Sequence, residues 1–160
     1  MRKLIVLAGL MLLGGMVCPA QTASVTGEWR GIWTNPEGVV FTAEMTLETG
    51  PSCKTCAVIS EGGIRGRIVW TLRKAGSKAT PETDGTTFTE LVKGEMKGSG
   101  LLVLSGYEID DPSHMKGTDQ YRLAISDNGK VMGGITLNGG SWTGQFIAAR
   151  AQPPERRAPQ

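Results

Sequence analysis

Several residue types on which catalysis and cofactor binding depend are scarce in this chain. Histidine occurs once in 160 residues, as His114, which excludes any site that needs two imidazoles. There are three cysteines, and the aromatic residues are four Trp, two Tyr and three Phe. The formal net charge is only +2, so there is no basic excess of the kind that marks binding to nucleic acid or to an anionic membrane. What the chain does have is 39% hydrophobic residues and 23 glycines, which is typical of one domain of ordinary size.

Residues 1–20 are predicted to be a secretory signal peptide. Two basic residues follow the first Met, and residues 4–17 are an apolar and Gly run too short to span a bilayer comfortably. The small side chain of Ala20 favours cleavage after it, whereas lipid modification of Cys18 and a retained anchor are the alternatives. Cleavage would lower the 17 basic residues to 15, equal to the 15 acidic ones. We therefore expect a neutral exported protein, periplasmic or secreted, with no stable membrane insertion and no nucleic-acid partner.

The rest of the chain is predicted to be all-β. No segment repeats apolar residues at helical spacing over ten or more positions, and glycines recur at intervals that would break a helix. Residues 41–48 alternate strictly between apolar and polar side chains, which is typical of a strand with one buried face. Residues 64–73 alternate in the same way, with Trp70 on the apolar face. The predicted strands are residues 28–34, 41–48, 64–73, 87–96, 101–109, 119–126, 131–137 and 141–150.

Short turns separate these strands and favour pairing in sequence order. Residues 35–38, 127–130 and 138–140 supply the Asn and Gly that tight hairpins need. Such a meander has two free edges, and closing the sheet into a barrel removes them. We therefore predict an antiparallel eight-stranded up-and-down β-barrel over residues 24–150, with an open two-layer sandwich as the alternative. Glycines inside the strands would permit the strong coiling of a small barrel; they are Gly31, Gly66, Gly94, Gly106, Gly133 and Gly144.

Two segments at opposite ends of this domain share one pattern. Residues 27–33 and 140–146 both read Gly-x-Trp-x-Gly-x-aromatic. We interpret them as strands in equivalent environments, the first and the last, that pair at the seam of the barrel. Residues 151–160 contain three prolines and nothing to bury, which predicts a disordered tail.

The start Gly27-x-Trp29 and the closing Arg150 resemble the calycin superfamily, which includes lipocalins, fatty-acid-binding proteins and avidins. In those families an Arg or Lys of the last strand lies over the Trp at the closed end of the barrel. The resemblance implies this role for Trp29 and Arg150, as a cation–π contact worth about 1–2 kcal/mol. Because Trp142 follows Gly140 with the same spacing, either Trp could be the plug.

Residues 33–41 read Trp-x-Asn-x-x-Gly-x-x-Phe, which is similar to the opening strand and loop of the avidins, whose Asn contacts the biotin ring. Residues 142–146 likewise look like one of their inner strands. The avidin Ser that follows the Gly is Val39 here, and the other hydroxyl and acidic contacts have no counterpart that we can place. A polar ring ligand needs all its hydrogen-bond partners, so we do not expect biotin binding.

Two polar clusters could carry chemistry. Cys53 and Cys56 form a Cys-x-x-Cys motif, but its flanks predict a turn and a strand rather than the helix N-terminus of redox enzymes, and zinc would need further ligands. We expect a local disulfide between them, since the compartment is oxidising. Asp110, Asp111 and His114 gather between the fifth and sixth strands. We interpret this cluster as a polar turn, with a cation site or an acid–base pair as the alternative.

These features favour binding without catalysis. A hydrolytic triad lacks a histidine partner, and the Gly-rich loops precede strands rather than helices. We expect no cofactor and no metal, and a barrel whose open end binds a small apolar ligand or a peptide segment. The alternative is a packed barrel that acts as a protein-interaction or protease-inhibitor module through its surface; a cavity below about 300 Å³ would favour it. An enzyme that uses the Asp110–His114 loop ranks last. The candidate ligand-binding residues are Trp33, Asn35, Trp70, Tyr121, Trp142 and Phe146.

Overall fold

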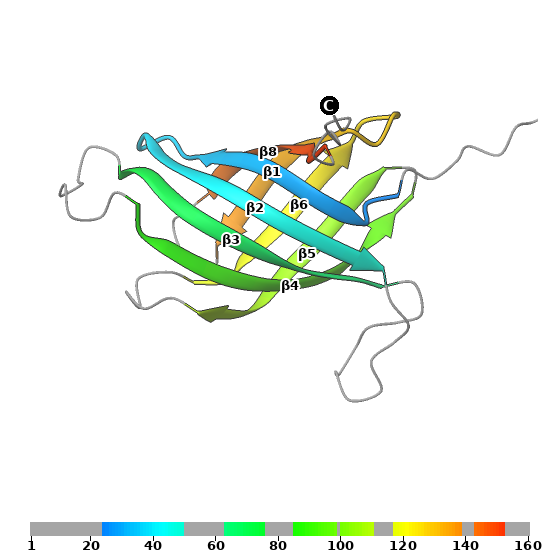
Figure 1. Cartoon of the computed structure of the whole chain (residues 1–160), viewed down its shortest axis with the longest axis horizontal. Coiled ribbons are helices and arrows are strands. Elements are labelled where there is room, and N and C mark those ends of the chain that lie inside the picture. Colours follow the sequence, from blue (N-terminus) through cyan, green and yellow to red (C-terminus); the bar gives the residue numbers. More distant parts are fainter. Residues whose placement is uncertain are drawn as a thin grey trace, which may run out of the picture.

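A computed structural model describes residues 24–49, 63–75, 85–98, 100–110, 117–138 and 143–152. The strands in these ranges are β1 (Gly27–Thr34), β2 (Val39–Thr49), β3 (Ile64–Ala75), β4 (Thr87–Lys97), β5 (Leu101–Asp110), β6 (Asp119–Ile125), β7 (Val131–Asn138) and β8 (Thr143–Arg150). They form one sheet that closes on itself in sequence order, with every neighbouring pair antiparallel (Figure 1). The predicted eight-stranded up-and-down barrel is confirmed, and the open sandwich is excluded.

Several predictions concern residues outside the described ranges. These residues are the signal peptide (1–20), the Cys53–Cys56 motif, Asp111, His114, Trp142 and residues 153–160 of the tail. The expectations for them stay predictions. No helix in the described part of the chain is long and apolar enough to cross a membrane.

The alternation of side chains along each strand builds the barrel wall. In β2 every odd-numbered side chain from Val39 to Leu47 is buried, and the side chains between them are half-buried or exposed. In β3 the side chains of Ile68 and Trp70 are buried in the same way. All eight strands contribute to one apolar cluster inside the barrel. Burial of each large apolar side chain stabilises the fold by about 1.5–3 kcal/mol, so this inward face supplies much of the driving force for closure.

The seam of the barrel lies between the first and last strands. Across it Trp29 pairs with Arg150, and Trp33 pairs with Phe146. Figure 1 shows β1 running between β2 and β8. The pairing predicted from the repeated Gly-x-Trp pattern is therefore confirmed for the strands, and it leaves neither strand with a free edge.

Two tight turns depend on glycine. Gly38 has φ of 80° and its N–H donates to the carbonyl of Asn35 over 3.0 Å. The side-chain oxygen of Asn35 also accepts from the N–H of Val39 at 3.0 Å. Gly129 has φ of 64°, and its N–H donates to the carbonyl of Ser126 over 2.8 Å. Residues other than Gly rarely adopt such positive φ angles, which is why these positions stop one strand and start the next.

Glycines within the strands make room for large interior side chains. A Cβ at Gly144 would lie 2.1 Å from the indole of Trp33. A Cβ at Gly106 would lie 1.9 Å from a carboxyl oxygen of Glu90. Glycine is thus needed at these two positions for a more specific reason than strand coiling. A buried side chain packs closely against the backbone at each of them.

The two ends of the barrel differ in what they carry. We define the open end as the end with the β1–β2, β3–β4, β5–β6 and β7–β8 connections, and the closed end as the opposite one. The register shifts between Val40 and Phe41 in the β2–β3 pair and between Leu91 and Val92 in the β4–β5 pair. Such irregularities bend and twist a sheet, and they set which inward side chains reach the open end.

Candidate binding site at the open end of the barrel

The closed end is filled by Trp29 and Arg150. The guanidinium carbon of Arg150 lies 4.5 Å from the centroid of the Trp29 ring, a cation–π contact. The indole N–H of Trp29 donates to the carbonyl of Val25 over 2.9 Å. The guanidinium also donates to the carbonyl oxygens of Ser24, Thr26 and Gly129. Among the described residues, this end is therefore filled by packed, hydrogen-bonded side chains.

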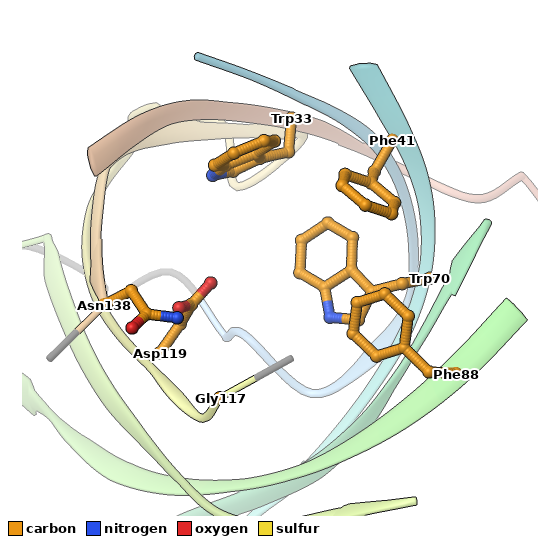
Figure 2. Close-up of a pocket in the computed structure, with 7 residues that line it drawn as sticks. All are labelled: Trp33, Phe41, Trp70, Phe88, Gly117, Asp119 and Asn138. Carbon is orange, nitrogen blue, oxygen red and sulfur yellow. The ribbon is translucent and has the colours of Figure 1, made fainter. Parts of the chain in front are cut away.

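Four aromatic side chains gather at the open end, and we call them the aromatic cage. They are Trp33 of β1, Phe41 of β2, Trp70 of β3 and Phe88 of β4. The ring of Phe41 lies 5.7 Å from that of Trp33, 6.2 Å from that of Trp70 and 5.6 Å from that of Phe88, each in an edge-to-face arrangement. Such arrangements are the favoured ones for aromatic pairs. Figure 2 shows all four side chains on one side of the barrel mouth, pointing into it.

The opposite side of the mouth is polar. Asp119 at the start of β6 pairs with Asn138 at the end of β7, and Gly117 precedes them. Figure 2 shows the side chains of Asp119 and Asn138 facing the cage across one small pocket. About 30 Å³ of this pocket is open to the centre of a water molecule. This is room for a few waters or for one compact chemical group, and not for a whole drug-sized ligand.

Glu90 of β4 is 1% exposed and does not itself line the pocket. One carboxyl oxygen accepts hydrogen bonds from the indole N–H of Trp70 at 3.3 Å and from the hydroxyl of Tyr121. The other accepts from the backbone N–H of Asp119 at 2.7 Å. Since Trp70 and Asp119 also line the pocket, Glu90 is one hydrogen bond away from it.

The protonation of this network is set by its burial. Burial is the largest cause that raises the pKa of Glu90 from 4.5 to about 7, and the Asp119 charge adds to it. The hydrogen bonds from Asp119, Tyr121 and Trp70 lower the pKa of Glu90 and offset only part of this rise. Burial, and then the charge of Glu90, also raise the pKa of Tyr121 well above its ordinary value. Near neutral pH, Tyr121 therefore keeps its proton, and Glu90 is about half ionised.

The structure separates the candidate ligand-binding residues into groups. Trp33 and Trp70 line the pocket. Tyr121 and Phe146 lie deeper in the core, where the ring of Phe146 is 5.7 Å from that of Trp70. Asn35 lies in the β1–β2 turn, where its side chain holds its own turn, and it does not line the pocket. Trp142, the remaining candidate, lies outside the described residues.

Six residues of the site were not among those candidates: Phe41, Phe88, Glu90, Gly117, Asp119 and Asn138. A signal for Glu90 was available, because it lies between Phe88 and Val92 on the inward face of its strand. Asp119 and Asn138 had no such signal. They lie at strand ends and meet the cage only through the register of the closed sheet.

The described residues around the pocket do not form a metal centre. Within the described ranges, no three Asp, Glu, His or Cys side chains gather where they could hold a metal ion. The carboxyl group of Asp119 lines the pocket, whereas that of Glu90 lies outside its lining and accepts from the backbone N–H of Asp119. The arrangement is suited to binding a compact group against aromatic rings.

A second feature lies on the outer surface, and we call it the apolar outer face. It consists of Ile32, Val131, Ile135 and Ile147, which are 40–59% exposed. They come from β1, β7 and β8, and Ile32 pairs directly with Ile147 across the seam. Ile32 and Ile147 both line two shallow hollows of the surface.

The sequence matches no family model, and no curated protein matches it significantly. The interpretation of the site therefore depends on its geometry and chemistry.

Proposed function

We propose that this protein is an exported, calycin-like, non-catalytic barrel that receives one compact projecting group in its open end. The group would be a headgroup or the end of a peptide side chain. The observation that carries the proposal is the aromatic cage around a small pocket at one end of a barrel whose other end is filled. Rings that border a void lose contacts that a filled core would supply, and such concave aromatic sites are typical of binding pockets.

The size of the pocket bears on both candidate functions. A cavity below about 300 Å³ favours the packed barrel that acts through its surface, and for binding in the pocket it narrows the expected ligand. Its 30 Å³ is about a tenth of the volume that a whole small molecule needs. A group that projects from a larger molecule needs only this space, because the rest of that molecule stays outside the barrel. This also accommodates the peptide segment expected from the sequence.

The residues at the pocket support binding rather than catalysis. Both carboxyl oxygens of Glu90 accept hydrogen bonds from the protein, and the side chain is 1% exposed. A general acid or base must come within hydrogen-bond reach of its substrate. Among the described residues that line the pocket there is no Ser, Thr, Cys or Lys to act as a nucleophile.

The proposal is tested by following the indole N–H signals of Trp33 and Trp70 by NMR. The full chain is titrated with two compact probes, choline and 3,3-dimethyl-1-butanol, with the Trp29 signal at the closed end as an internal control. We expect at least one probe to shift the two cage signals and leave Trp29 unmoved. If neither probe moves Trp33 or Trp70, the proposed function is wrong.

A matched pair of variants places the binding at the cage. Phe88→Leu removes one ring of the cage and should weaken binding of the probe about fivefold or more, because an aromatic contact is lost. Tyr107→Leu removes a ring from β5 that is 50% exposed, and it should leave probe affinity unchanged. Equal effects of the two substitutions would contradict binding at the cage.

The second candidate function is a protein-interaction or protease-inhibitor module, and the apolar outer face favours it. Contiguous exposed apolar side chains often mark protein–protein contacts. Analytical ultracentrifugation of the full chain with and without the paired substitutions Ile32→Thr and Ile147→Thr tests this candidate. If association is lost in this variant while the cage signals respond to no probe, the outer face carries the function.

A further inference from the structure

Resting on the proposed function, we propose that the group received at the open end is a methylated ammonium cation. The rings of the aromatic cage would surround its methyl groups, and the carboxyl groups of Glu90 and Asp119 would offset its charge. The proposal is carried by three features of the site, which are the rings, the sign of the nearby charge and the lack of acceptors among the described residues on the ring side.

The rings supply a surface that attracts cations. The face of an aromatic ring carries negative electrostatic potential, and a cation over it is bound more strongly where water is excluded. The four rings pack against one another and line the same pocket, so a group seated in it touches more than one ring. A methylated ammonium presents carbon to each ring while it keeps its positive charge.

The charge around the pocket is acidic. The carboxyl group of Glu90 lies at the N–H edge of the Trp70 ring. Asp119 faces the cage across the pocket. After burial, the further influence that raises the pKa of Glu90 is the negative charge of Asp119. Lys and Arg are absent from the described residues that line the pocket. Such a site attracts a cation and disfavours an anion.

The hydrogen bond between Trp70 and Glu90 reinforces this preference. The indole N–H donates to the carboxyl group over 3.3 Å. A donor that bonds to an ionised acceptor is polarised by it, which makes the ring face more electron-rich. Ionised Glu90 therefore acts on the pocket both by its charge and through the Trp70 ring.

The ring side of the pocket suits a methylated ammonium better than a primary one. A buried primary ammonium has three N–H donors that each need an acceptor. The indole nitrogens of the cage cannot accept, and their hydrogens are already donated, by Trp33 to Thr136 at 2.5 Å and by Trp70 to Glu90. Methyl groups need no hydrogen bond, so the carbon surface of the cage suits them.

The test compares choline with 3,3-dimethyl-1-butanol, which has the same shape but carbon in place of the charged nitrogen. The full chain is titrated with each at pH 8, and the Trp33 and Trp70 indole signals report the affinity. We expect choline to bind at least about tenfold more tightly. Equal binding of the two probes would overturn the cation inference but leave the proposed function standing. Binding of neither probe would overturn both.

Substitution of Glu90 separates the charge from the shape. Glu90→Gln should weaken choline binding about tenfold and leave 3,3-dimethyl-1-butanol unaffected. Glu95→Gln, at an exposed position of the same strand, is the matched control and should change neither affinity. An unchanged affinity for choline in Glu90→Gln would contradict the role of this carboxyl group.

A second measurement needs no substitution, in case Glu90→Gln does not fold. The affinity of the unaltered chain for choline should rise several-fold from pH 6 to pH 8, as Glu90 ionises, whereas that for the neutral probe should stay constant. Among the described residues, the titratable groups that act on Glu90 are Asp119 and Tyr121 of β6. Tyr121 keeps its proton over this range, since its pKa is raised further by burial. A choline affinity that does not change with pH would contradict the inference.

Discussion

Glu90 is the only charged residue among the described ones that is buried, and the wall of the barrel is shaped around it. Its carboxyl group is held by donors from Trp70, Tyr121 and Asp119, which come from two different strands. A buried acid with a raised pKa lowers stability when it must ionise, and such groups are retained more often at functional sites than elsewhere. At the scale of single residues, the most specific predictions therefore concern this carboxyl group.

Stability should fall as pH rises through the titration of Glu90. The pKa of its carboxyl group is about 7 in the folded state and 4.5 ordinarily, so the folded protein holds the proton more tightly. The contribution to the free energy of unfolding is therefore full below about pH 4.5, decreases between 4.5 and 7, and is lost above 7. The total loss is about 3 kcal/mol at most.

Urea unfolding of the unaltered chain and of Glu90→Gln across pH 4.5–8 measures this effect. The difference in free energy of unfolding between the two should change with pH in the stated direction, whereas Glu95→Gln should follow the unaltered chain. Parallel pH profiles for the unaltered chain and Glu90→Gln would show that Glu90 titrates with an ordinary pKa.

A second prediction concerns Gly106, against which the carboxyl group of Glu90 packs. Gly106→Ala places a Cβ 1.9 Å from the carboxyl oxygen, so the side chain must shift and its hydrogen bonds must distort. We expect a loss of about 2 kcal/mol or more in the free energy of unfolding. Gly133→Ala is the control, because its Cβ would have no neighbour closer than 3.4 Å, and its loss should stay below about 1 kcal/mol. Similar losses in the two variants would contradict a tight fit at Gly106.

At the scale of strands, β1 and β8 are joined by Arg150 as well as by their ladder. This residue combines the ring contact with Trp29 and donation to three backbone carbonyl groups. Arg150→Lys keeps the charge but loses the planar fork that makes these contacts together. We expect thermal or urea unfolding to show a loss of about 1–3 kcal/mol in the free energy of unfolding.

Arg30→Lys on β1 is the control for this substitution. Arg30 is exposed and its nitrogen lies 3.9 Å from an oxygen of Glu44, a surface pair that contributes little. The free energy of unfolding should change by no more than about 0.5 kcal/mol in this variant. If Arg150→Lys is equally mild, the contact with Trp29 does not hold the seam together.

The strands themselves could be predicted from the sequence, because the signals that specify them are local. The alternation in residues 41–48 and the Gly at positions 38 and 129 specify a half-buried strand and two turns without knowledge of the rest of the chain. The pocket could not be predicted in this way. Glu90 and Tyr121 lie on strands that are not neighbours, and which side chains meet across the interior depends on register shifts that leave no mark in the sequence.

At the scale of the whole molecule, the two ends of the barrel differ, and the apolar outer face lies on its outside. One end is filled by Trp29 and Arg150, and the other holds the aromatic cage with carboxyl groups beside it. The apolar outer face lies across the seam on β1, β7 and β8. A compact cationic group and a protein surface would therefore bind at different places, and the location of binding distinguishes the two candidate functions.

The most direct measurement of that location is a set of intermolecular nuclear Overhauser effects between the methyl protons of choline and the protein. We expect contacts to ring protons of Trp70 and Phe88 in the cage, and none to Ile32 or Ile147 of the apolar outer face. Contacts confined to those isoleucines, or no contacts at a choline concentration that saturates any shift, would contradict a binding site at the open end of the barrel.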